Sequence, residues 1–107
     1  MIIERAEIPV IPGKEEEFEA AMGHCKSLLS SAKGCRSIQL ARGVENPSKY
    51  LLIFEWESIE DHIAFTRSPA FEEYRDIAGP YFAAKPAMEH FAPVAAKCPF
   101  TAWIRGR

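Results

Sequence analysis

The sequence predicts an α+β domain in which four short strands are interleaved with two helical segments. Three observations point to this class. Apolar residues alternate or form short bulky runs in four segments, as in strands, and recur at three- and four-residue steps in two others, as in amphipathic helices. Glycine and proline pairs separate these segments and mark the turns. A chain of 107 residues with 48% hydrophobic and 26% charged residues has the size and composition of one globular domain.

The first two predicted elements are a strand and a long helix. Residues 2–10 alternate in the manner of a strand, and their even positions are apolar except at Glu4. Pro12-Gly13 is the turn that follows. From Lys14 onwards the apolar period is helical, and the helix is expected to end at Lys33-Gly34, because glycine commonly follows the last helical residue.

The third strand, residues 50–56, is the segment on which the rest of the prediction depends. Residues 35–42 form the second strand, and the loop of residues 43–48, which contains Asn46-Pro47, joins the two strands as a hairpin. In the run YLLIFEW nearly every side chain on both sides of the strand is large and apolar. We therefore expect this strand to be buried on both of its faces.

A broken helix and a fourth strand complete the domain. Ser58 is expected to cap the helix, and Ser68-Pro69 to interrupt and restart it, with serine as the cap and proline at the first helical position. Gly79-Pro80 ends the helix, and residues 87–94 form the last strand. Residues 95–107 follow as an apolar tail without a clear period, which we expect to pack on its own subunit or on a neighbouring one.

The resulting order, β-α-β-β-α-β, predicts a ferredoxin-like subunit, in which a four-stranded antiparallel sheet carries both helices on one face. The opposite face would then leave the second side of residues 50–56 in water. Exposing several such side chains costs about 1.5–3 kcal/mol each. Two subunits are therefore expected to pack sheet to sheet as a homodimer.

Charge and cysteine content exclude several classes of protein. A formal net charge of −2 lacks the basic surface of a nucleic-acid-binding protein. No apolar run approaches the ~18 residues of a membrane span, and the chain opens on strand-like sequence, so a cytoplasmic protein without a membrane partner is expected. Cys25, Cys35 and Cys98 are odd in number and lack CxxC spacing, which favours free thiols. Neither metal-ligand spacing nor a glycine-rich phosphate loop occurs, so no metal is expected.

Several strings in the chain are similar to a known family. They are Gly34-Cys35 at a strand start, the run from Phe54 to Ser58 with His62, the run from Ser68 to Phe71, and Glu89-His90-Phe91. Together they resemble the antibiotic biosynthesis monooxygenase (ABM) family over residues 1–94, with the tail of residues 95–107 outside the resemblance. The resemblance implies a ferredoxin-like subunit that dimerises through its sheet into an α+β barrel and keeps a pocket between its sheet and its helices.

The resemblance also implies an activity, namely a cofactor-independent monooxygenase that acts on a small aromatic or quinol-type molecule. Such enzymes stabilise the anion of an easily oxidised substrate in a dry pocket, and the anion passes an electron to oxygen. A non-catalytic module that binds a small molecule or only dimerises is the alternative. Haem degradation is disfavoured, because the asparagine, tryptophan and histidine that haem-degrading members use align here with Ala6, Phe65 and Arg75.

His62 is the candidate catalytic residue. Its helix face also carries apolar side chains, so it is expected to point towards the sheet, where an imidazole in an apolar pocket can take a proton near neutral pH. The alternative is a core histidine that makes a structural hydrogen bond. Family members similar to quinol oxygenases carry a histidine at the position of Phe65, and His62 lies one turn earlier on the same helix.

Aromatic residues near His62 are the candidate substrate-binding groups. Trp56 and Phe54 could wall an aromatic ligand or fill the core, and Phe65 is expected to line the same pocket. Tyr74, on the next helical segment, could donate a hydrogen bond to a substrate carbonyl or could be a core residue. His90 on the fourth strand could line either the pocket or the dimer interface, and the sequence favours neither.

Overall fold

The computed structural model describes residues 1–94, and it confirms the predicted α+β class. In chain order the elements are β1 (Ile2–Pro9), α1 (Glu15–Ser30), β2 (Cys35–Arg42), β3 (Lys49–Trp56), α2 (Ile59–Thr66), α3 (Pro69–Ala78), a 3₁₀ turn (Gly79–Tyr81) and β4 (Ala87–Phe91). The predicted tail of residues 95–107 lies outside the described residues. No helix within residues 1–94 is long and apolar enough to span a bilayer.

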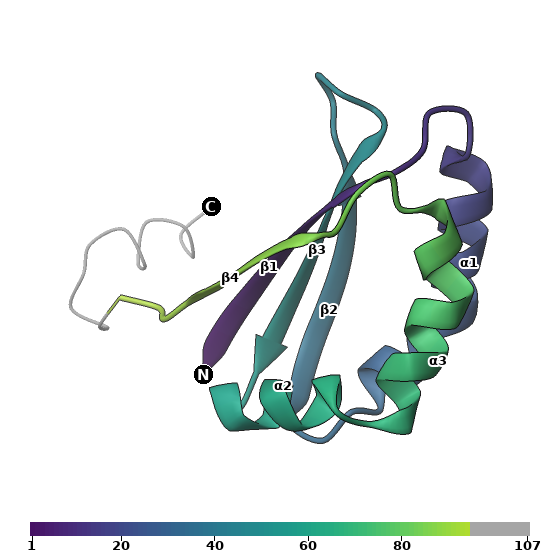
Figure 1. Cartoon of the computed structure of the whole chain (residues 1–107). Coiled ribbons are helices and arrows are strands. Elements are labelled where there is room, and N and C mark those ends of the chain that lie inside the picture. Colours follow the sequence, from purple (N-terminus) through teal and green to yellow (C-terminus); the bar gives the residue numbers. More distant parts are fainter. Residues whose placement is uncertain (95–107) are drawn as a thin grey trace.

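The strands form one antiparallel sheet in the order β2-β3-β1-β4, which is the ferredoxin-like arrangement. Helices α1, α2 and α3 all lie on one side of this sheet, and no helix of the described chain covers the other side (Figure 1). β1 and β3 are the two central strands, paired from Ile2 with Trp56 to Pro9 with Lys49. Because strand side chains alternate between faces, each strand presents one row to the helices and one row to the helix-free side.

β3 has the predicted alternation of side chains. Its even residues, from Tyr50 to Trp56, face the helices and are buried, with at most 3% of each exposed. Leu51, Ile53 and Glu55 face the helix-free side and are half-buried in the single chain. The chain thus covers one face of β3 by itself, and the covering of the other face by a second subunit stays a prediction.

Two serines divide the helical region after β3 as predicted. The hydroxyl of Ser58 accepts a hydrogen bond from the Asp61 backbone N–H at 3.2 Å and caps α2. The hydroxyl of Ser68 accepts one from the Phe71 backbone N–H at 3.2 Å and caps α3, whose first residue is Pro69. After this interruption α3 runs in a different direction from α2, so the two helices border different parts of the sheet (Figure 1).

Two elements end earlier than predicted. α1 ends at Ser30 and not at Lys33-Gly34, and Ser31 is its C-cap residue. Gly34 lies in the turn before β2, where its carbonyl accepts a hydrogen bond from the Glu57 N–H at 2.8 Å. β4 ends at Phe91 and not at residue 94. Its last residue pairs with Ile3, and β1 begins at Ile2, so only one residue of β1 is left for the residues after Phe91 to pair with.

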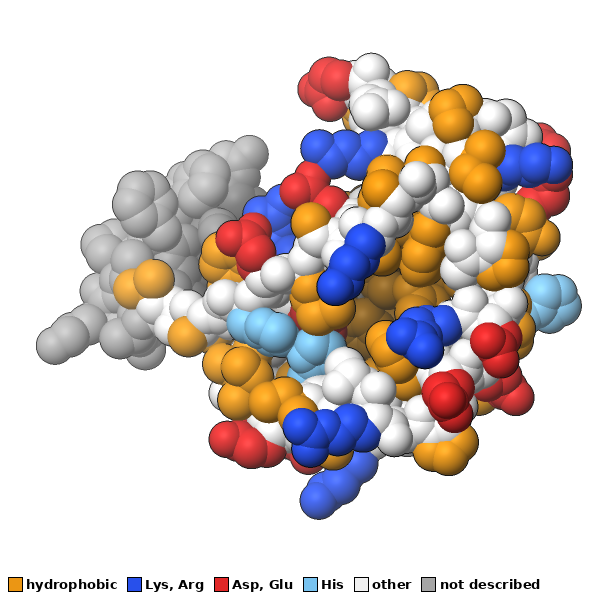
Figure 2. Space-filling model, in the orientation of Figure 1, with side chains coloured by type: hydrophobic (Ala, Val, Ile, Leu, Met, Phe, Trp, Pro, Cys, Tyr) orange, Lys and Arg blue, Asp and Glu red, His pale blue; other side chains and the backbone are white. Residues whose placement is uncertain are grey.

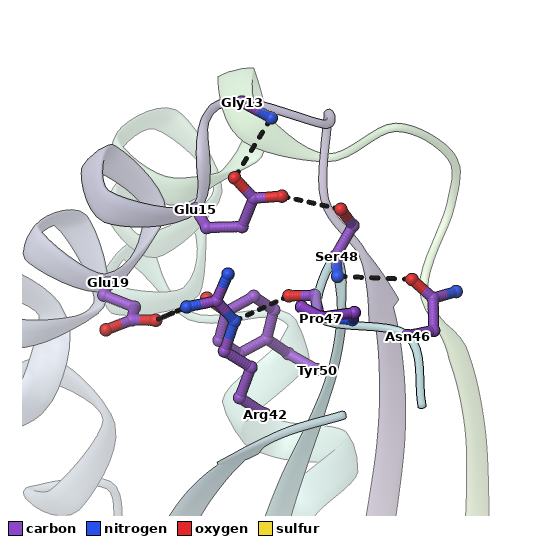
Figure 3. A network of polar contacts seen from close by, with 8 residues as sticks. All are labelled: Gly13, Glu15, Glu19, Arg42, Asn46, Pro47, Ser48 and Tyr50. Carbon is purple, nitrogen blue, oxygen red and sulfur yellow. Dashed lines mark hydrogen bonds and ion pairs between the residues drawn. The ribbon is translucent and has the colours of Figure 1, made fainter. Parts of the chain in front are cut away.

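A polar network joins α1 to the β2–β3 hairpin at the end of the sheet away from α2 (Figure 3). The Glu15 carboxylate accepts hydrogen bonds from the Gly13 backbone N–H at 3.0 Å and from the Ser48 hydroxyl at 2.6 Å. One turn further along α1, Glu19 accepts a hydrogen bond from the Tyr50 hydroxyl. These contacts fix the start of α1 against the hairpin.

Gly34→Ala is expected to lower the free energy of unfolding by more than Gly13→Ala. Both glycines have a positive φ, 84° at Gly34 and 92° at Gly13, a conformation that costs alanine about 1–2 kcal/mol. A Cβ at Gly34 would also collide with the Asp61 side chain, whereas a Cβ at Gly13 meets nothing within 4 Å. Urea denaturation of both variants measures the difference, and equal losses would contradict the close packing of Gly34 against α2.

Candidate active site

A cavity of about 340 Å³ lies between the sheet and helices α2 and α3. This volume is at the lower end of the ~300–1,000 Å³ that is typical of small-molecule sites. Most of its walls are apolar, and its ionisable lining residues are Glu4, His62, Tyr74, Arg75 and Lys85. Figure 2 shows a hollow with hydrophobic walls here, with basic side chains on its rim and histidines beside it. Two other hollows border α1, and they are more open to solvent and contain neither Glu4 nor a histidine.

Glu4 lines this cavity from the side of the sheet. Glu4 is on β1 in the row that faces the helices, and only 3% of it is exposed. Its Oε1 accepts a hydrogen bond from the Trp56 indole N–H at 2.9 Å and lies 3.2 Å from Nε2 of His62. Burial raises the pKa of Glu4, and the hydrogen bond from Trp56 opposes this rise.

His62 points from α2 towards the sheet, as its helix face predicted, and only 4% of it is exposed. Its Nδ1 lies 2.7 Å from Nε2 of His90, and its Nε2 lies 3.2 Å from Glu4. Burial, with a smaller contribution from His90, lowers the pKa of His62 to about 4. The imidazole is therefore neutral at pH 7. Its Nδ1 is within hydrogen-bond distance of His90, and its Nε2 is within ion-pair distance of Glu4.

His90 lies on the helix-facing side of β4. It is paired in register with Glu4 on β1, so its side chain belongs to the same row as the cavity residues and not to the helix-free face. β4 is the edge strand, and His90 is exposed. The sequence left open whether His90 lies at the pocket or at the dimer interface. The structure places it beside the cavity, where its exposed ring contacts the buried ring of His62.

Aromatic rings form a continuous row from β3 to α3. Trp56 packs on Phe65 with ring centroids 5.8 Å apart, Phe65 on Phe71 at 5.5 Å, and Phe71 on Tyr74 at 5.8 Å. Burial raises the pKa of Tyr74, with Cys25 and Glu4 adding to the rise, so its hydroxyl is a neutral donor at pH 7. Tyr74 lines the cavity and could donate this proton to a ligand oxygen.

The predicted site residues fall into two groups. Phe54, Phe65, Tyr74 and His62 line the cavity. Trp56 does not, because its ring is fully buried behind Phe54 and Phe65, where its N–H holds Glu4. His90 contacts the cavity group His62 without itself lining the cavity.

Sequence reasoning missed Glu4 as a site residue. The signal was present, since an acid interrupts the apolar positions of a strand that is otherwise apolar on that side. The three positions aligned with the haem-degrading residues, Ala6, Phe65 and Arg75, also line the cavity, and none of these side chains is a usual iron ligand. Within residues 1–94 no group of three or more histidine, cysteine or acidic side chains is arranged to hold a metal ion.

His62 is expected to stay neutral well below its ordinary pKa. In the unfolded chain it takes up a proton near pH 6.5, and in the folded chain only near pH 4. Between these values the unfolded state binds more protons, so this residue lowers the free energy of unfolding as the pH falls from 6.5 towards 4 and contributes no pH dependence above 6.5. NMR titration of the assigned His62 ring measures the shift directly, and a midpoint near 6.5 would contradict it.

Comparison with known sequences places these features in a family. The family model described as antibiotic biosynthesis monooxygenase matches residues 1–77. The uncharacterized protein YczJ of Bacillus subtilis (strain 168) is 34% identical over 95 residues, which are 88% of this chain and 100% of that protein. A 42.8 kDa protein in the whiE locus of Streptomyces coelicolor is 32% identical over 73 residues, which are 68% of this chain and 18% of that protein.

Solved structures agree with the sequence comparison. A Bordetella bronchiseptica protein that bears the same family name is 37% identical, with a TM-score of 0.84 over 88% of this chain and 97% of that chain. One from Caulobacter crescentus, 23% identical with a TM-score of 0.78 over 88% of this chain and 90% of that chain, has the same fold. The family model, the relatives and the fold agree, and the chain belongs to the antibiotic biosynthesis monooxygenase family.

Proposed function

We propose that this protein is a cofactor-independent oxygenase that oxidises a small aromatic or quinol-type molecule in the cavity between sheet and helices. The observation that carries the proposal is an apolar cavity that contains a buried carboxylate–imidazole pair, Glu4 and His62. Membership of the family supports the reaction type. The aromatic rings of Phe54, Phe65 and Phe71 in the cavity wall suit a flat, unsaturated substrate.

The proposed reaction needs the substrate anion, and the cavity contains groups suited to form and hold it. The carboxylate–imidazole pair supplies the base, Tyr74 supplies a neutral donor for the developing oxyanion, and Arg75 and Lys85 in the lining favour negative charge. The anion gives electrons to O₂ and then bonds to it. For a methylene substrate, CH₂ and O₂ yield C=O and H₂O, so one oxygen atom enters the product and the other leaves as water.

The proposal includes a homodimer that forms through the helix-free face of the sheet. This face carries Ile3, Leu51, Ile53 and Phe91 among polar residues, and in the single chain they are half-buried or exposed. Covering them would remove apolar surface from water, at about 25 cal/mol for each Å². A cytoplasmic location also belongs to the proposal, and the free thiols of Cys25 and Cys35 agree with a reducing compartment.

Oxygen uptake tests the activity. With a dihydroanthracenone or a reduced naphthoquinone as substrate, the protein is expected to consume oxygen faster than buffer alone. His62→Ala should lower this rate by about 10²-fold or more, the usual contribution of acid–base catalysis. His24→Ala is the matched control, because His24 is exposed on α1 and away from the cavity, and it should keep the wild-type rate. Uptake equal to buffer across the panel would favour a binding module instead.

Light scattering after size exclusion tests the dimer. The wild-type protein is expected to elute with twice the 12.0 kDa mass of one chain. Ile53→Glu puts a charge at the centre of the helix-free face and should shift the protein towards the monomer, because a buried unpaired charge is costly. Val44→Glu, in the hairpin loop where 89% of the residue is exposed, should leave the mass unchanged. A wild-type monomer at micromolar concentration would contradict the proposed interface.

A further inference from the structure

Only one of the two oxygens of the Glu4 carboxylate contacts other side chains of residues 1–94. Both of its contacts, with the Trp56 N–H and with Nε2 of His62, are made by Oε1. Glu4 itself lines the cavity. Within residues 1–94 Oε2 makes no hydrogen bond or ion pair, so we infer that it is the oxygen available to a molecule in the cavity.

His62 has the opposite arrangement. Its Nε2 is in contact with Glu4 and its Nδ1 is in contact with His90, so neither ring nitrogen is left for a substrate. His90 is exposed on the edge strand. The three side chains therefore form a line of contacts, at 3.2 Å and 2.7 Å, from Oε1 of the Glu4 carboxylate to the exposed ring of His90.

We propose that Glu4 is the base that takes the substrate proton and that His62 and His90 carry this proton to the solvent. The assignment rests on the function proposed above and deepens it. A C–H or O–H bond of the substrate breaks, its electron pair stays on the substrate, and the proton bonds to Glu4. The protonated carboxyl group then rotates to bring this proton to Nε2 of His62, His62 gives its Nδ1 proton to Nε2 of His90, and His90 gives its Nδ1 proton to water. Both rings return to their starting tautomers before the next proton arrives.

The environment favours this division of roles. Burial disfavours the charged form of His62. A ring that gains a proton at one nitrogen while it loses one at the other stays neutral, so this transfer avoids the charged form. Burial also raises the pKa of Glu4, which makes its carboxylate a stronger base than an exposed one.

Other ionisable groups near Glu4 come from several elements. They are Cys35 on β2, Tyr74 and Arg75 on α3, and Lys85 before β4. Among the described residues only His62 is within ion-pair distance of the Glu4 carboxylate. The proton of Glu4 therefore has one direct protein partner, which is the first member of the proposed path.

Exchange of the substrate's acidic C–H for deuterium tests the base, because this step needs no oxygen. A dihydroanthracenone is incubated anaerobically in D₂O with the protein, and deuterium incorporation is followed by mass spectrometry. The wild-type protein should accelerate exchange, and Glu4→Gln, which keeps an oxygen for Trp56, should slow it by about 10²-fold or more. Glu7→Gln is the matched control on the same strand, since Glu7 faces the helix-free side and pairs with Lys49. A rate of deuterium incorporation with Glu4→Gln that equals the wild-type rate would overturn the assignment of Glu4 as the base.

His90→Phe tests the path to solvent. In dilute buffer this variant should exchange more slowly than wild type, and added imidazole should restore its rate by accepting the proton in place of His90. Imidazole should not restore Glu4→Gln, because that variant lacks the base itself. A His90→Phe rate that equals wild type, or that falls and is not restored by imidazole, would overturn the path.

A titration without substrate separates this inference from the proposed function. Carbon-13 NMR of the Glu4 carboxyl and nitrogen-15 NMR of both rings should show one linked step, in which Glu4 titrates above the ~4.3 of an exposed glutamate. Deuterium exchange without oxygen uptake under air would support Glu4 as the base and contradict the oxygenase. A carboxyl titration that leaves the nitrogen shifts of His62 unchanged would overturn the path, whatever the oxygen uptake.

Discussion

The buried carboxylate of Glu4, on the face of the sheet that the helices cover, is the constraint on which this structure depends. A carboxylate in apolar surroundings costs several kcal/mol unless it is paired and hydrogen-bonded. Trp56 from β3 donates a hydrogen bond to Glu4, and His62 from α2 lies 3.2 Å from the same oxygen, so contacts of one acid join a strand end and a helix to β1. A well-packed apolar side chain would serve stability at lower cost. The presence of an acid in this row is therefore better explained by chemistry than by stability.

The cavity follows from how the helices are divided. Ser68 caps α3 after a break from α2, and this lets the two helices border different parts of the sheet. The row of rings from Trp56 through Phe65 and Phe71 to Tyr74 then closes one side with apolar surface. A small number of polar groups in an otherwise apolar enclosure is the usual composition of a small-molecule site, and hydrogen bonds and charges act more strongly there than in water.

Sequence patterns predicted the fold well, because each element depended on local signals. The alternation of β3, the serine caps and the interrupted helix all follow from residues close together in the chain. The ends of α1 and β4 did not follow, and that of β4 depends on pairing with a strand distant in the chain. The site was predicted only in part. His62 and its direction could be read from one helix face, but its partners lie on β1 and β4, and neither register nor distance across the sheet is visible in the sequence.

The indole N–H of Trp56 reports directly on whether a buried, hydrogen-bonded Glu4 carboxylate organises the site. The chain has two tryptophans, and Trp56→Phe assigns the signal in a ¹H–¹⁵N spectrum. We expect this N–H to exchange with D₂O about as slowly as the core backbone amides and to change its chemical shift when Glu4 is protonated. Rapid exchange together with a shift that is constant over the titration of Glu4 would contradict it.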